Sequence, residues 1–154
     1  MKHWLLKTEP STFGIEDLQD ATRRTTSWEG VRNFQARNFI RDQIKKGDQA
    51  FLYHSSCAEP GIAGLVRVVR GAYPDRSAFN RRDAHYDPAS TDADPRWYTF
   101  DVQLVRRLKR VIGLDELRAH AKDELSGMAL LRAGNRLSIT PVEDAHWRFI
   151  LALE

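Results

Sequence analysis

The segment from Ser27 to Arg41 (SWEGVRNFQARNFIR) gathers side chains that can hold a planar, polar ligand. Trp28 is followed by a glycine and a predicted helix start, so its indole should lie on a turn beside outward-pointing backbone N–H groups. An indole face can stack on a ring such as a nucleobase with about 1–3 kcal/mol. Arg32 and Asn33 can bind a polar edge. A tryptophan that closes the end of a sheet gives the same pattern, and both interpretations stay open.

A second candidate for chemistry is the pair His54 and Cys57, which lie three residues apart. An imidazole beside a thiolate would make a nucleophilic pair. The alternative is that Cys57 only begins the loop CAEPG and that His54 is a core histidine with its hydrogen bonds satisfied.

The sequence lacks the motifs by which enzymes commonly hold metals and nucleotide cofactors. Its five histidines are scattered, with no pair four residues apart, and the single cysteine has no second cysteine to complete a zinc pattern. Neither GxxxxGK(S/T) nor GxGxxG occurs, so the usual phosphate cradles are missing. No carboxylates stand in a recognisable acid/base arrangement. We therefore expect no catalytic residue, no metal and no cofactor.

The composition is that of one ordinary folded domain with a modest positive charge. The 154 residues are 42% hydrophobic, which is enough to bury a core, and the net charge is +3. Eighteen arginines outnumber six lysines. This excess either favours an anionic partner or reflects a genome rich in G and C.

The composition also indicates the cellular compartment. Charges interrupt every apolar run short of the roughly 20 residues that cross a bilayer. The segment Met1–Glu9 lacks the apolar core of a signal peptide, and one cysteine agrees with a reducing compartment. We expect a cytoplasmic, monomeric protein that does not bind a membrane.

Hydrophobic periodicity predicts a single domain, residues 1–154, with strands in the middle and helices around them. Strands are expected at Trp4–Lys7, Gln49–Ser55, Gly61–Tyr73, Trp97–Leu104 and Leu137–Val142. Short helices are expected at Phe13–Gln19, Leu114–Ala121 and Met128–Arg132, and a capping box at Thr140–Glu143 should open a last helix through Leu151. The pattern is typical of a small mixed sheet or barrel with peripheral helices.

The longest predicted helix is Val31–Lys45, ended by Gly47. Arg37, Arg41 and Lys45 follow at i+4 steps and should form one basic face. Together with Arg32, that face suits a nucleic-acid backbone, although a solvated basic face has the same pattern.

The stretch Pro74–Arg96 shows turn signals and little periodicity, so it is predicted to be a long loop. Such a loop within a compact domain is usually functional or disordered. Its aromatic residues Phe79 and Tyr86 could form a wall of a ligand pocket or could only anchor the loop.

Several motifs taken in order make the chain resemble the EVE domain family. They are WLLKTEP (4–10), WEGVRNFQARN (28–38), GDQAFLYHSS (47–56), PGIAG (60–64), AYPD (72–75), YDP (86–88) and LLRAGNRLS (130–138). The resemblance covers essentially the whole chain. It implies an α+β, PUA-like pseudo-barrel of mixed strands with peripheral helices, related to the YTH readers of methylated adenine.

The resemblance also implies a pocket for one nucleobase, with methyl- or hydroxymethylcytosine as the leading candidate. The residues that match the pocket are Lys7, Thr8, Glu9, Trp28, Asn33, His54, Ser55 and Ser56. Glu9 could accept from an exocyclic amino group, although Lys7 and Glu9 could also be a plain surface pair. Thr8 and Phe34 depart from the family pattern, which more often has Ser and Tyr there.

The resulting hypothesis is a non-catalytic module that binds DNA or RNA carrying a modified base. The alternative is an enzyme or small-molecule sensor that uses the same pocket for a nucleotide-like ligand.

Overall fold

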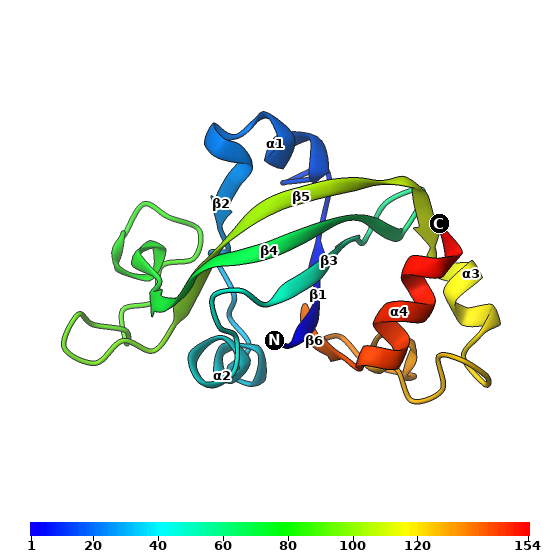
Figure 1. The fold of residues 1–154 in the computed structure, drawn as a ribbon. Coiled ribbons are helices and arrows are strands. Elements are labelled where there is room, and N and C mark those ends of the chain that lie inside the picture. Colours follow the sequence, from blue (N-terminus) through cyan, green and yellow to red (C-terminus); the bar gives the residue numbers. More distant parts are fainter.

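The computed structural model describes residues 1–154 as one six-stranded sheet with helices packed on both faces (Figure 1). The strands are β1 (His3–Thr8), β2 (Thr25–Ser27), β3 (Gln49–His54), β4 (Gly61–Pro74), β5 (Tyr98–Gly113) and β6 (Ile139–Val142). The helices are α1 (Ile15–Asp20), α2 (Phe34–Asp42), α3 (Leu114–Ala119) and α4 (Asp144–Leu153), with short 3-10 turns η1 (Thr22–Arg24), η2 (Arg76–Phe79) and η3 (Ala129–Leu131). None of these helices has the length and apolar character needed to cross a bilayer.

The strand order across the sheet is β2-β5-β4-β3-β1-β6. β1 runs parallel to β3, and the other neighbouring strands are antiparallel, so the sheet is mixed. Figure 1 shows β1 crossing the direction of β4 and β5 steeply, which curves the sheet, but the edge strands β2 and β6 do not pair and it stays open. The prediction of an α+β fold with mixed strands and peripheral helices is confirmed.

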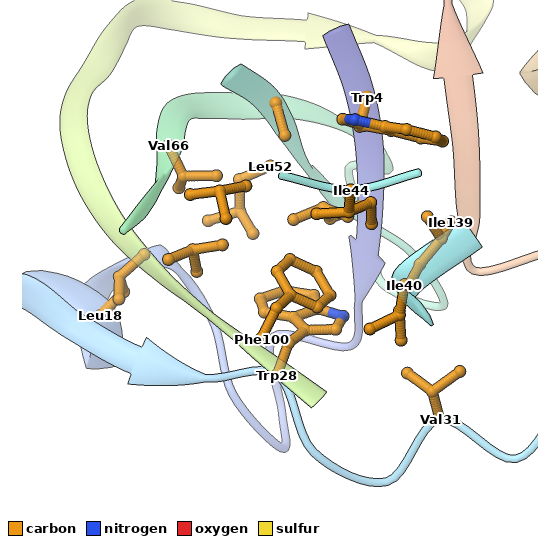
Figure 2. Packing of buried hydrophobic residues seen from close by; sticks show 14 of the residues in the cluster. Trp4, Leu18, Trp28, Val31, Ile40, Ile44, Leu52, Val66, Phe100 and Ile139 are labelled. Carbon is orange, nitrogen blue, oxygen red and sulfur yellow. The ribbon is translucent and has the colours of Figure 1, made fainter. Parts of the chain in front are cut away.

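Each face of the sheet carries its own hydrophobic cluster. On one face Trp4, Leu6 and Phe100 pack with Trp28 and with residues of α1 and α2 (Figure 2). On the other face Leu5 and residues of β3 pack against α3 and α4. Because successive strand residues point to opposite faces, β1 feeds both clusters in turn.

This alternation decides where the end of β1 points. Thr8 continues the face of Leu6, whereas Lys7 continues the face of Leu5 and lies opposite Tyr53 in the parallel register with β3. The two polar side chains therefore leave β1 on different sides.

The bounds predicted for the longest helix were wrong at both ends. α2 begins only at Phe34, because Asn33 is its N-cap and the Asn33 side chain accepts from the amide of Ala36 at 3.0 Å. It ends at Asp42, and the amide of Lys45 donates instead to buried Asp48. Lys45 is thus outside the helix and does not extend a helical face.

Several other elements differ from the prediction: β2 was not expected, and the helix expected at Met128–Arg132 is only the 3-10 turn η3. β5 runs on to Gly113. The sequence pattern did not predict this extension, because register shifts against β4 interrupt the in–out alternation of side chains on which the pattern depends. The expected capping box at Thr140–Glu143 is also wrong, since Thr140 is a β6 residue paired with Leu5 and its hydroxyl caps nothing.

Candidate nucleic-acid interface

A cavity of about 480 Å³ opens beside Trp28, and we call it the Trp28 cavity. It lies between the end of β1, the segment that leads from β2 to α2, and the loop after β4. Five of its lining residues were singled out from sequence: Lys7, Thr8, Glu9, Trp28 and Arg32. The others are Thr12, Phe13, Thr26, Ser27, Glu29, Gly30, Val31, His85 and Ser138.

Trp28 is both part of the core and part of the cavity wall. Its side chain is 8% exposed and packs against Phe100, with ring centroids 6.4 Å apart and planes tilted by 34° (Figure 2). Its amide donates to the Phe100 carbonyl at 2.7 Å, which fixes it next to β5. The indole N–H makes no hydrogen bond within the protein and is not sealed in the core, so it remains a donor at the cavity. Trp28 therefore fits both interpretations made from the sequence, because it packs in the core at the sheet and also offers its indole to a ligand cavity.

A fully buried carboxylate ties the cavity wall to the long loop. Asp75 accepts from the Gly30 amide at 2.9 Å, from Arg32 Nη1 at 3.1 Å and from the Ser77 amide and hydroxyl at 2.9 and 2.6 Å. Burial by itself would raise the pKa of Asp75, but the hydrogen bonds from Ser77, Gly30 and Arg32 outweigh it and lower that pKa. Asp75 is thus held as an anion between two segments 45 residues apart in sequence.

The guanidinium of Arg32 is occupied by this clamp. Besides Asp75, it donates to the Ser77 hydroxyl at 3.2 Å and twice to the carbonyl of His85, at 2.7 and 3.1 Å. Arg32 was expected to contact a nucleic-acid backbone. Its placement makes it the residue that holds His85 at the cavity.

Gly30 is the point at which the loop closes onto the wall. Its φ of +82° is a conformation that L side chains adopt at a cost, and a Cβ there would lie 2.6 Å from Nε2 of His85. The other ring nitrogen of His85 lies 3.1 Å from Asp83. The loop therefore contributes His85 to the cavity lining, and neither Phe79 nor Tyr86.

Four residues matched to the pocket from sequence do not line the cavity. Asn33 is used as the α2 cap, and Nε2 of His54 accepts from the amide of Ile15 at 3.1 Å. The amide of Ser55 donates to the Thr8 carbonyl at 2.9 Å, and Ser56 sits in the following turn with a φ of +53°. These residues shape the end of β1 and β3 instead of facing the cavity.

His54 and Cys57 form no pair. Burial, and then the charge of Arg107, lower the pKa of His54, which suits a neutral ring that accepts at Nε2. Cys57 is a partly exposed free thiol. No group of three or more His, Cys, Asp or Glu side chains comes together as a metal site.

The basic residues of the α2 segment are largely engaged with their neighbours. Arg37 donates to the Arg96 carbonyl at 2.7 Å and lies over the Phe34 ring, and Arg41 pairs with Asp42 at 2.8 Å. The continuous face expected for Arg37, Arg41 and Lys45 is not formed.

Sequence reasoning missed residues of two kinds. Ser27, Glu29 and Gly30 adjoin Trp28, so their neighbourhood was a usable signal. His85 lines the cavity, and Asp75 supports its wall, only through contacts across 45 residues or more. Asp75 belongs to the motif AYPD, but nothing in the sequence pattern gave either residue a role at the cavity.

The sequence matches one family model over almost its whole length. The model of the EVE domain matches residues 2–153. The chain belongs to the EVE domain family. Among EVE proteins of similar sequence is human thymocyte nuclear protein 1, 46% identical over 166 aligned residues that cover 99% of this chain and 73% of the relative. An uncharacterised protein of Schizosaccharomyces pombe is 43% identical and covers 97% of this chain and 66% of that protein.

Solved EVE structures agree closely with this fold. Human THYN1 in complex with DNA that contains 5-methylcytosine superposes with a TM-score of 0.94 at 44% identity, covering 99% of this chain and 97% of that one. A Pseudomonas syringae protein gives a TM-score of 0.91 at 42% identity, with 98% of each chain covered.

Proposed function

We propose that this EVE domain is a non-catalytic DNA-binding module that holds a flipped 5-methylcytosine base in the Trp28 cavity. The observation that carries the proposal is Trp28 itself, a tryptophan fixed by the core whose indole N–H is left free at the cavity wall. A base that leaves the helical stack needs a ring to contact and polar groups to read its edge.

The other lining groups suit a cytosine edge. Glu9 and Glu29 place carboxylates at the cavity, and a carboxylate can accept from the exocyclic amino group of cytosine. Thr12 and Ser138 add hydroxyls that donate or accept, whereas the Thr8 hydroxyl donates to the Phe13 carbonyl at 2.6 Å and can only accept from a ligand. The 5-methylcytosine DNA bound by human THYN1, in a fold with a TM-score of 0.94 to this one, supports the same ligand class here.

A binding role rather than catalysis fits the residues around the cavity. Its lining holds no cysteine, the His85 ring bonds to Asp83 and to no hydroxyl that it could activate as a nucleophile, and His54 is engaged with the backbone of Ile15. The alternative of an enzyme or small-molecule sensor in the same cavity predicts turnover or tight binding of a free nucleotide.

The test is the affinity for oligonucleotides that differ only in one cytosine, methylated or unmethylated, measured by fluorescence anisotropy. We expect the methylated DNA to bind more tightly, and Trp28→Phe to weaken binding about two- to thirteen-fold by deleting one net hydrogen bond while keeping a ring. The matched control is Trp147→Phe, because Trp147 is also buried, at 5% exposed, but lies in the cluster on the other face.

Equal affinity for both DNAs, or unchanged binding by folded Trp28→Phe and Trp28→Ala variants, contradicts the proposal. Tighter binding of an RNA with the same modified base would move the assignment to RNA. Product formed from the oligonucleotide or from nucleotides in the same samples would select the enzyme.

A further inference from the structure

A second hollow, of about 430 Å³, lies at the end of β1, and we call it the Lys7 cleft. Its polar side chains are those of Lys7, Tyr53, Arg118, Arg132 and Asn135, and the remaining lining is leucine, alanine and glycine. No carboxylate lines it. It therefore presents hydrogen-bond donors and positive charge almost alone, the character of a site for an anion.

The cations of the cleft lack close counter-ions. Burial is the one cause that lowers the pKa of Lys7, and no carboxylate pairs with its ammonium group. Arg132 is exposed and forms no ion pair. Arg118 has a single acidic neighbour, Asp115, at 3.9 Å, and that carboxylate is fully exposed to solvent. An entering anion would not need to displace a strong internal partner.

A buried phenol adds a neutral donor to these charges. Tyr53 is 3% exposed, and its hydroxyl makes no hydrogen bond within the protein. Burial raises the pKa of Tyr53, although the nearby charge of Arg118 opposes this, so the hydroxyl keeps its proton at neutral pH. Cys57 is the other titratable group that bears on this phenol.

Lys7 joins the two hollows, because it lines both the cleft and the Trp28 cavity. Resting on the function proposed above, we propose that the Lys7 cleft binds a backbone phosphodiester of the DNA strand whose base occupies the Trp28 cavity. The strand would pass over the end of β1, with its base on the Thr8 side and the phosphate on the Lys7 side.

Two arginines that were expected to contact the backbone, Arg32 and Arg41, are engaged elsewhere, which favours the cleft over the α2 segment for this contact. Arg32 is held by Asp75 and His85, and Arg41 by Asp42. The salt dependence of DNA binding should therefore arise in the cleft more than on α2.

The test is a series of oligonucleotides with the same 5-methylcytosine and one uncharged methylphosphonate linkage moved along the strand. For the wild-type protein we expect one or two positions beside the modified base to lose about tenfold in affinity, the scale of a charge-assisted hydrogen bond. The Arg132→Gln and Lys7→Met variants should each bind the DNA without a methylphosphonate about tenfold more weakly than the wild-type protein does. Their affinity should no longer fall when the methylphosphonate is placed at those linkages. Each should also reduce the log–log salt slope by about 0.7–0.9.

Arg136→Gln is the matched control, because it removes the same charge from the same exposed loop without lining either hollow. It should remain sensitive to the methylphosphonate. Arg132 is exposed, so its variant keeps the test valid even where Lys7→Met lowers the melting temperature.

The outcomes separate the two proposals. A wild-type preference for methylated DNA, with no methylphosphonate position mattering and unchanged slopes in the cleft variants, overturns the phosphate subsite and leaves the base reader intact. Loss of the preference for methylated DNA overturns the base reader, while the methylphosphonate series still reports on the cleft. Stabilisation of the protein by inorganic phosphate alone, equal to that by DNA, would show a free-anion site and overturn the phosphodiester assignment.

Discussion

The Trp28 cavity and the Lys7 cleft adjoin the same strand end but are built differently. The cavity has carboxylates, hydroxyls, an indole and an imidazole, and its wall depends on a loop clamped through buried Asp75. The cleft has positively charged and neutral donors and no carboxylate. These side chains come from β1, β3, α3 and the turn after η3. A ring with a patterned edge requires mixed groups held in fixed positions, whereas a phosphate requires mainly unneutralised charge.

The difference teaches where each function is vulnerable. Disturbing the clamp should damage base recognition and leave charge attraction in place. Removing Arg132, a cation that lines the cleft and not the cavity, should do the reverse. The predictions below test that separation, from the largest expected effect to the smallest.

Asp75→Asn should have the largest effect. Removing the charge of a buried carboxylate that faces Arg32 leaves the guanidinium unpaired, which typically costs 3–5 kcal/mol, so we expect about that loss in the free energy of unfolding. Urea denaturation measures it. Asp92→Asn is the control, since Asp92 belongs to the same loop but its side chain is 81% exposed. Its one ion pair, with an exposed arginine, is long at 3.9 Å. Equal losses in the two variants would contradict the clamp.

The same clamp gives a pH dependence. The pKa of Asp75 is lower in the folded chain than its ordinary value of 3.8, so its stabilising contribution is present above pH 3.8 and is lost as the pH falls through the lower folded value. Wild-type protein should lose stability in that acidic window more steeply than Asp75→Asn. Parallel pH profiles for the two proteins would argue against this assignment.

Gly30→Ala should have an intermediate effect that is confined to the Trp28 cavity. The positive φ costs about 1–2 kcal/mol for an L residue, and the new methyl group also collides with the His85 ring. Adding His85→Ala to Gly30→Ala should restore the part of the stability that the collision removes. A double-mutant cycle followed by thermal unfolding measures this, and additive losses would mean that the two residues are not in contact. The salt slope of DNA binding should stay unchanged throughout.

The sequence predicted the parts of the molecule that depend on local pattern. The strand cores follow from apolar periodicity, and a place for Trp28 at a ligand was one of the two interpretations that its neighbours allowed. The place of Lys7, Thr8 and Glu9 at the pocket came from the family resemblance. The family resemblance correctly implied the fold.

Contacts between distant segments were beyond local pattern. Asp75 looks like an ordinary turn residue, yet it is fully buried because Gly30 and Arg32 reach it from another segment. Asn33 and His54 were expected at the pocket for their side-chain chemistry, but backbone amides of Ala36 and Ile15 already use that chemistry. Backbone amides at helix starts also need acceptors, and matching residues to the family pocket did not take this competing use of the side chains into account.

The smallest expected effect is the discrimination between cytosine, 5-methylcytosine and 5-hydroxymethylcytosine. A methyl group that fills the cavity gains about 0.8 kcal/mol, or roughly fourfold in affinity over unmodified cytosine. For the hydroxymethyl form the available hydroxyls are those of Thr12 and Ser138, which line the cavity, whereas His54, Ser55 and Ser56 do not. The hydroxyls of Thr12 and Ser138 make no hydrogen bond within the protein, so either can bind the added hydroxyl. Such a bond adds about 0.5–1.5 kcal/mol, so hydroxymethylcytosine should bind at least as well as methylcytosine.

Titration of three otherwise identical oligonucleotides with wild-type, Thr12→Val and Ser138→Ala proteins measures this ordering. Removing the hydroxyl that contacts the ligand should abolish the advantage of the hydroxymethyl form and leave the fourfold gain from the methyl group unchanged, because that gain comes from burial alone. The Lys7 cleft should make no distinction among the three oligonucleotides, since their backbones are the same. A cleft variant such as Arg132→Gln that altered the order of the three bases would show that the two hollows are coupled. The tightest binding by unmodified cytosine would show instead that the Trp28 cavity does not read the methyl position at all.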